Sequence, residues 1–216
     1  MAALAEIIAD SQATWTQLWH HNNNETPDQS LLALIQKEHQ RNFKLWHQED
    51  KARAPMATAA NIATVKRTID RLNQERNDLI EKVDEQFLTI LHRHHVSQKI
   101  NSPWNSETPG SVIDRLSILS LKIFHMREQT ERPDATPTHI RKCQDRLVLL
   151  QQQRADLSVA LRQLLKDLFS GRKQMKLYRQ CKMYNDPTTN PEIYNGRKSR
   201  LRKPFVINSP CVDRLQ

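Results

Sequence analysis

The clearest pattern in the chain is the recurrence of apolar residues at every third or fourth position between residues 62 and 94. This spacing places them on one face of an α-helix, whose period is 3.6 residues. At a rise of 1.5 Å per residue, the helix is a rod of roughly 50 Å. A second long apolar series starts after Thr136 and Pro137 and continues to Leu168, and Gly171 is the predicted stop of that helix.

Three shorter helices follow from the same periodicity. The first covers about residues 2–20, and the second starts at the predicted cap Thr26 and ends near residue 53. Another starts near Thr108 and is apolar on so many sides that we expect it to be the most buried helix. The sequence therefore predicts an all-α fold, an antiparallel helical bundle of about five main helices with two long rods and an irregular basic C-terminal extension.

The two long helices also resemble each other in sequence. Residues 74–79 read QERNDL and residues 152–157 read QQRADL, at a constant offset of 78. Arg76 and Arg154 thereby occupy equivalent core-type positions, where an unpaired guanidinium is not tolerated. The similarity records either a duplication or two helices that meet the same packing requirement.

Charge is distributed unevenly, which separates the end of the chain from the rest. Residues 171–216 hold eleven Lys or Arg and three acidic residues, a net +8 of the chain's +9. We predict a helical bundle domain at 1–184 and a loop-rich basic tail at 185–216. Arg172, Lys176 and Arg179 fall on one face if this stretch is helical, and the partners to consider are nucleic acid or an anionic membrane surface. The alternative is a solvated helix with a solubilising tail.

Composition excludes several classes of protein. Only three glycines occur, too few for the glycine-rich phosphate loops of dinucleotide folds and P-loop enzymes. The three cysteines are widely spaced and odd in number, so neither a disulfide framework nor a zinc knuckle is expected. The N-terminus lacks a secretory signal and no apolar run is long enough to span a membrane. We expect a soluble, cytoplasmic protein, with a homo-oligomer as one alternative.

Four segments carry a resemblance to a known family. They are residues 42–53, residues 66–78, residues 101–119 with the motif NSPWNSETPGS, and residues 173–187 with KMYNDP. Together they resemble the bacterial domain-of-unknown-function family 4254, over about residues 5–194. The resemblance implies an all-helical fold and no assigned activity. It also implies a link to envelope polysaccharide synthesis, because the genes of such relatives often lie beside glycosyltransferase genes of that pathway.

Polar side chains at helical spacing predict a cleft between the second, third and fourth helices. We propose from this pattern that the cleft binds an anionic small molecule, such as a phosphorylated or nucleotide-linked sugar. Cations would neutralise the ligand, while amides and carboxylates would orient it. The predicted ligand-binding residues are Lys66, Asp70, Asn73, Arg76, Asn77, Asp114, Arg115 and Lys122. The alternative is that Arg76 and Arg154 pair with internal carboxylates, such as Asp50 or Asp114, and fix the helix register.

Two further hypotheses assign the protein another role: an enzyme that uses a histidine, or a scaffold without a ligand site. An enzyme would use His47 as general base in the same cleft, with Asp50 or Glu49 orienting it. A structural scaffold would use its long helices only for assembly. No Glu-x-x-His pair occurs, which argues against a di-iron bundle. A zinc or iron site of His47, Asp50 and a histidine from residues 92–95 is a third alternative, but we predict no metal and no cofactor.

Overall fold

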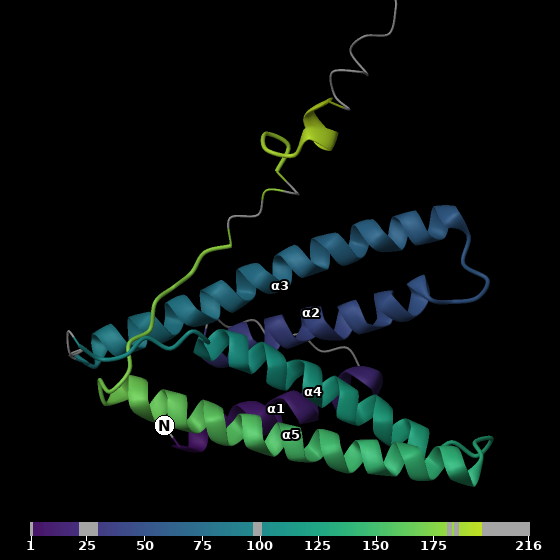
Figure 1. Cartoon of the computed structure of the whole chain (residues 1–216), viewed down its shortest axis with the longest axis horizontal. Coiled ribbons are helices and arrows are strands. Elements are labelled where there is room, and N and C mark those ends of the chain that lie inside the picture. Colours follow the sequence, from purple (N-terminus) through teal and green to yellow (C-terminus); the bar gives the residue numbers. More distant parts are fainter. Residues whose placement is uncertain (1, 22–29, 97–100, 181–182, 184–185, 196–216) are drawn as a thin grey trace, which may run out of the picture. The chain divides into compact units, whose positions relative to one another are not determined.

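Five long α-helices make up the protein in the computed structural model, which describes residues 2–21, 30–96, 101–180, 183 and 186–195 (Figure 1). The fold class is all-α, as predicted. The helices are α1 (Ala2–His21), α2 (Leu31–Ala52), α3 (Ala59–Arg93), α4 (Pro109–Thr130) and α5 (Pro137–Phe169).

Threonine caps start three of the helices. The side chains of Thr58, Thr108 and Thr136 each accept a backbone N–H from the first turn of α3, α4 and α5. The predicted starts of α4 and α5 are confirmed. The predicted start of α2 at Thr26 is wrong: α2 begins at Leu31 after the cap Ser30, whose hydroxyl accepts the Ala33 N–H at 3.2 Å. Residues 22–29 themselves lie outside the described residues.

Two antiparallel hairpins, α2 with α3 and α4 with α5, form the bundle (Figure 1). Short connections of six residues join the helices of each hairpin, which forces neighbouring helices to run antiparallel. Helix α1 packs against α2, α4 and α5, and α4 packs against every other long helix. The prediction that α4 is the most buried helix agrees with its eight buried residues, more than α2, α3 or α5 has.

The main core lies where α1, α4 and α5 meet the second half of α3. Phe87, Ile113 and Leu165 are among its fully buried side chains. A smaller cluster of Leu45, Ile69 and Leu72 joins α2 to the first half of α3. Ile62 is 44% exposed, although the apolar pattern placed it on the packed face. The first turn of α3 thus extends beyond the buried part of the helix.

A close contact fastens the start of α4 to α3. The Gly110 N–H donates to Asp84 Oδ1 at 2.7 Å, and a Cβ at Gly110 would lie 2.8 Å from that oxygen and from the Ile80 carbonyl. Only glycine permits this approach. Burial raises the pKa of Asp84 to about 6, against the lowering effect of its hydrogen bonds from Thr108 and Gly110.

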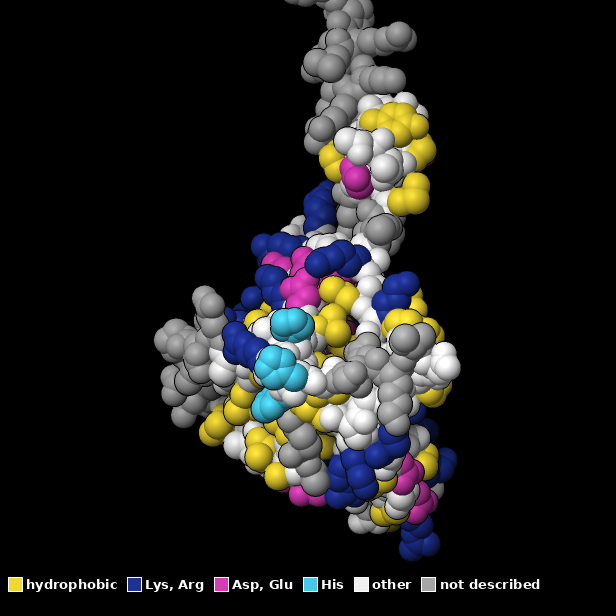
Figure 2. Space-filling view, turned by 90° about the vertical axis from the view of Figure 1, so that its left-hand side faces the viewer, with side chains coloured by type: hydrophobic (Ala, Val, Ile, Leu, Met, Phe, Trp, Pro, Cys, Tyr) yellow, Lys and Arg dark blue, Asp and Glu magenta, His cyan; other side chains and the backbone are white. Residues whose placement is uncertain are grey.

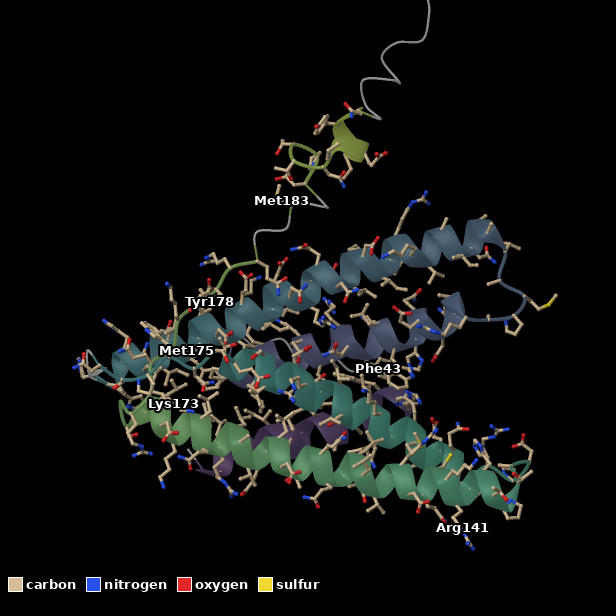
Figure 3. The ribbon with its side chains drawn as sticks, viewed as in Figure 1. Phe43, Arg141, Lys173, Met175, Tyr178 and Met183 are labelled. Carbon is tan, nitrogen blue, oxygen red and sulfur yellow. The ribbon has the colours of Figure 1, made fainter. Side chains whose placement is uncertain are left out.

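The chain leaves the helical conformation after α5. Gly171 has a φ of 69°, in the left-handed region, and residues 172–180 are not helical. Gln174 instead forms a β-bridge with Trp104, and the Gln174 N–H donates to the Pro103 carbonyl at 3.0 Å. The expected helical face of Arg172, Lys176 and Arg179 is therefore wrong. Lys173 and Met175 lie at the end of the bundle where α5 ends (Figure 3), and Met175 is buried in the core.

The chain divides into two compact units, residues 1–178 and 179–216. The boundary at 184/185 stays a prediction. Of the second unit, the structure describes residues 179–180, 183 and 186–195, so most of its basic residues lie outside the described part. Binding to nucleic acid or to an anionic membrane, and homo-oligomer formation, also stay predictions. Among the described residues, no helix is long and apolar enough to cross a membrane.

Candidate functional site

Seven polar side chains form a continuous network inside the bundle, which we call the central network. They come from α1, α2, α3 and α4, and most of them are buried. The members are Thr16, Glu38, His39, Asn42, Arg76, Asp114 and Ser117.

Asn42 lies at the centre of this network. Its amide nitrogen is 2.5 Å from Glu38 Oε1, 2.8 Å from Asp114 Oδ1 and 2.8 Å from Ser117 Oγ. Its amide oxygen accepts a hydrogen bond from Arg76 Nη1 at 3.5 Å. Arg76 Nε is also 3.7 Å from Asp114 Oδ1, so the arginine has a carboxylate partner from another helix. The structure thus has the pairing of Arg76 with Asp114 that was one alternative at the sequence level.

Two buried members of the network are held in their neutral forms. Burial raises the pKa of Glu38 well above its usual range, and the neighbouring Asp114 raises it further, while Arg76 opposes the shift. Protonated Glu38 can donate a hydrogen bond to Asp114. Burial lowers the pKa of His39 to about 3, and its two ring nitrogens are bonded to Thr16 Oγ1 at 2.9 Å and Ser117 Oγ at 2.7 Å. The ion pair of the network is thus the one between Arg76 and Asp114.

A pocket of about 420 Å³ opens beside Asn42 and Arg76, between α2, α3 and α4; we call it the α2–α3–α4 pocket. It combines two arginines, two amides, two carboxylates and an apolar wall that includes an indole. The lining residues are Asn42, Leu45, Trp46, Glu49, Asp50, Arg53, Asn73, Arg76, Ile118 and Leu121.

The structure brings together some of the predicted ligand-binding residues and leaves others apart. Asn73 and Arg76 line the α2–α3–α4 pocket, and Asp114 contacts Arg76 behind it. Lys66 instead pairs with Asp70 on the exposed side of α3. Arg115 pairs with Glu107 at 2.5 Å, also at the surface.

Two predicted residues remain. Asn77 is half-buried on α3 and does not line the α2–α3–α4 pocket. Lys122 lines a different pocket of about 590 Å³, which also contains Asp50 and His125 and which we call the α4–α5 pocket. A ligand role for Lys66, Asp70, Asn77, Arg115 and Lys122 stays a prediction.

Asn42, Trp46 and Arg53 were not predicted as part of the site, and Glu49 was predicted only in the enzyme alternative, as a residue that orients His47. These four residues follow one another at three- and four-residue steps, so they lie on one face of α2 and its C-cap, Arg53. The sequence does indicate this face of α2, because polar residues interrupt the apolar periodicity on the side that faces α3.

Three histidines from different helices form a second group, the histidine cluster of His20 in α1, His47 in α2 and His125 in α4. Each offers one ring nitrogen, and these three nitrogens lie within 4.8 Å of one another. The predicted acid–base pair is part of this region, because His47 Nδ1 lies 3.8 Å from Asp50 Oδ2. Burial lowers the pKa of His47, and His20 and His125 lower it further.

The histidines at residues 92–95 do not join this group in the described part of the chain. His92, His94 and His95 are exposed at the end of α3, and Figure 2 looks onto that end of the bundle, where histidine side chains lie at the surface. The start of α3, not its end, lies near His47, since α2 and α3 are antiparallel. The metal alternative built on His47, Asp50 and one of these histidines therefore does not match the structure.

A family model described as "Protein of unknown function (DUF4254)" matches residues 32–177. The chain belongs to this family. The match covers α3, α4, α5 and all of α2 except Leu31, and thus both the α2–α3–α4 pocket and two of the three clustered histidines. No curated protein and no solved structure is significantly similar to this DUF4254 member. Its function therefore has to be argued from its own side chains.

Proposed function

We propose that this DUF4254 protein binds an anionic sugar derivative, a phosphorylated or nucleotide-linked sugar, in the α2–α3–α4 pocket. The observation that carries the proposal is the presence of Arg53 and Arg76 in one pocket with two amides, two carboxylates and an indole. The volume of about 420 Å³ lies within the range of small-molecule sites.

Each kind of side chain in the pocket matches one part of such a ligand. Guanidinium groups bind phosphate oxygens through two parallel hydrogen bonds. The carboxylates of Glu49 and Asp50 accept hydrogen bonds from sugar hydroxyls, and the amides of Asn42 and Asn73 can donate as well as accept. Trp46 offers a flat apolar surface to a sugar ring or a base.

The two arginines differ in how free they are to meet a phosphate. Arg76 is held by Asn42 and Asp114, so its position is fixed before a ligand arrives. Arg53, the C-cap of α2, is 71% exposed and pairs with Glu49 in the preceding turn. Exposed ion pairs of this kind contribute little to stability. We therefore assign the first phosphate contact to Arg53 and the orientation of the ligand to Arg76 and Asn73.

The gene neighbourhood that the resemblance implies supports the same kind of ligand. Relatives encoded beside glycosyltransferases of envelope polysaccharide synthesis would meet sugar nucleotides, which are made in the cytoplasm. A cytoplasmic binding or accessory protein of that pathway is part of the proposal.

An enzyme that uses His47 and Asp50 is the second candidate. The lowered pKa of His47 keeps its imidazole neutral at pH 7, as a general base requires. Asp50 lines the α2–α3–α4 pocket and lies 3.8 Å from His47 Nδ1, longer than a hydrogen bond. Chemical change of a bound ligand, followed by chromatography, would favour this candidate over a binding protein.

The proposal is tested by calorimetric titration of the protein with UDP-glucose and with glucose 1-phosphate. We expect Arg53→Ala and Asn73→Ala each to weaken binding by about tenfold or more, since a hydrogen bond to a charged group contributes about 1.5–3 kcal/mol. Arg67→Ala is the matched control, because Arg67 is an exposed arginine of α3 outside the pocket. Glucose, which lacks the phosphate, should not bind measurably. Equal affinities for the wild type and both pocket variants would contradict the proposal, and so would the absence of binding.

A further inference from the structure

The histidine cluster has the geometry of a set of metal ligands. Its three imidazoles come from α1, α2 and α4, which are separate in sequence and are brought together only by the packing of the bundle. Their ring nitrogens lie within 4.8 Å of one another. Nitrogen ligands of a tetrahedral zinc ion lie about 2.0–2.1 Å from the metal, and hence about 3.3 Å apart. Binding would draw the rings together by about 1 to 1.5 Å, a movement that side-chain torsions allow.

The hydrogen bonds of two of the rings fix which nitrogen is available. His20 Nδ1 is 2.6 Å from the Thr16 carbonyl oxygen, and His125 Nδ1 is 2.7 Å from Glu128 Oε2. Carbonyl and carboxylate oxygens only accept, so each Nδ1 carries the proton and each Nε2 carries the lone pair. Metal-binding histidines are oriented in this way, by a carbonyl or carboxylate on the other ring nitrogen.

The free nitrogens are buried and have no partner. Both His20 Nε2 and His125 Nε2 are shielded from solvent and lack a hydrogen bond. A buried nitrogen lone pair without a donor costs free energy, and a cation shared by the clustered imidazoles would give both atoms a partner. His39 shows the contrast within the same bundle, since both of its nitrogens have hydroxyl partners.

The surroundings are suited to neutral imidazole ligands. His20 stacks on Phe124 with ring centroids 3.9 Å apart, and His125 stacks on Trp46 at 4.6 Å. Phe43 packs edge-on against both His20 and His47. These rings keep the imidazoles in place and limit the access of water. Charged side chains lie at the edge of the cluster, where Asp50 and Glu128 are beside His47 and His125 and Lys51 also acts on His47.

From this arrangement we propose that His20, His47 and His125 bind one divalent transition-metal ion, with Zn²⁺ as the best match. Imidazole is a preferred ligand of zinc, and three protein ligands leave a fourth position for water or a substrate. His125 and Asp50 also line the α4–α5 pocket of about 590 Å³, so a molecule in that pocket can lie next to the metal. This inference is separate from the proposed sugar site, which neither His20, His47 nor His125 lines.

The experiment uses the full chain without a polyhistidine tag, stripped with EDTA and titrated with ZnCl₂ by calorimetry. We expect one Zn²⁺ per chain and a rise in the melting temperature on binding. His47→Ala and His125→Ala should each weaken Zn²⁺ binding at least 100-fold. His92→Ala, which removes an exposed histidine at the end of α3, should leave it unchanged. Binding of Co²⁺ should give the visible absorption of a tetrahedral site, and His47→Ala should remove it.

A milder variant tests the orientation of the ligands in a protein whose fold is not disturbed. Glu128 is half-exposed, so Glu128→Gln should fold normally and weaken Zn²⁺ binding by about tenfold, because the amide accepts less strongly from His125. Glu131→Gln, at the C-cap of the same helix α4, is the control. No stoichiometric binding, or binding that survives both His47→Ala and His125→Ala, would overturn the proposal. If the rings share a proton and bind no metal, the titration will show no stoichiometric Zn²⁺ binding.

Discussion

The central network and the histidine cluster both lie between α2 and α4, yet their polar atoms differ in the partners they have. In the central network, Asn42 contacts three oxygens and His39 uses both ring nitrogens. Glu38 Oε2 and Arg76 Nε have no hydrogen bond, but both side chains interact with the Asp114 carboxylate. In the histidine cluster, the Nε2 atoms of His20 and His125 have no partner.

This difference separates a structural role from a ligand-binding one. Buried polar groups that satisfy one another specify how helices pack and need nothing else. Buried groups that converge without partners leave room for an ion or a molecule. The α2–α3–α4 pocket lies at the edge of the central network, where Arg76 and Asn73 line a cavity. We therefore expect substitutions in the central network to lower stability, and substitutions in the histidine cluster to weaken ligand binding.

Arg76→Ala should have the largest effect on stability. It removes the cation beside Asp114, whose side chain is 13% exposed, and also a donor to Asn42. Breaking a buried ion pair leaves a carboxylate without compensation, so we expect a loss of roughly 3 kcal/mol in the free energy of unfolding. Urea denaturation measures the loss. A loss below about 1 kcal/mol would mean that the network does not hold the helices together.

His39 should remain neutral in acid, where an unperturbed histidine protonates. Its pKa of about 3 in the folded protein lies below the unfolded value of about 6.5, so the unfolded state binds the extra proton first. The contribution of His39 to stability is complete above pH 6.5 and decreases as the pH falls, by about 2 kcal/mol at pH 5.

Nitrogen-15 spectra of the imidazoles test this directly. The His39 ring should keep its neutral chemical shifts from pH 7 to pH 5, and the urea-unfolded chain should show all histidines titrating. Protonation of His39 in the folded protein above pH 5 would show that the Thr16–His39–Ser117 contacts are weaker than the structure indicates.

Arg154→Ala should have the smallest effect, although Arg154 occupies the position in α5 that Arg76 occupies in α3. Its guanidinium donates to the Ala9 carbonyl at 2.7 Å and pairs with Asp10, whose side chain is 80% exposed. Since water can replace the arginine at an exposed carboxylate, we expect a loss of about 1 kcal/mol, measured by the same urea denaturation. A loss equal to that of Arg76→Ala would make the two helices equivalent in energy as well as in sequence.

The fold was largely predictable because local signals agree with the tertiary structure. Thr108 and Thr136 cap helices at the predicted positions, and Gly171 follows α5 in the left-handed conformation that stops a helix. The start of α2 was misplaced because Thr26 and Ser30 are both good caps, and only the packing of Leu31 onward decides between them.

The site was predictable only in part. Arg76 and Asn73 are polar residues on a helix with a strong apolar face, which marks them for an internal role. The grouping of His20 with His125 leaves no trace in the sequence, because 104 residues separate them and nothing local requires their meeting. It depends on how α1 packs against α4 and on the aromatic rings that hold both imidazoles.

The fastening of Gly110 to Asp84 determines how far events at one site can be felt at the other. Helix α4 supplies Asp114 to the central network and His125 to the histidine cluster, eleven residues or about 16 Å further along. With its first turn held against α3, α4 resists translation along its axis, so closure of the imidazoles around an ion would come mainly from rotation of the rings. Trp46 and Asp50 line the α2–α3–α4 pocket and lie beside His125 and His47. Communication between the proposed sugar and metal sites would therefore pass through these two side chains of α2 and not through a shift of α4.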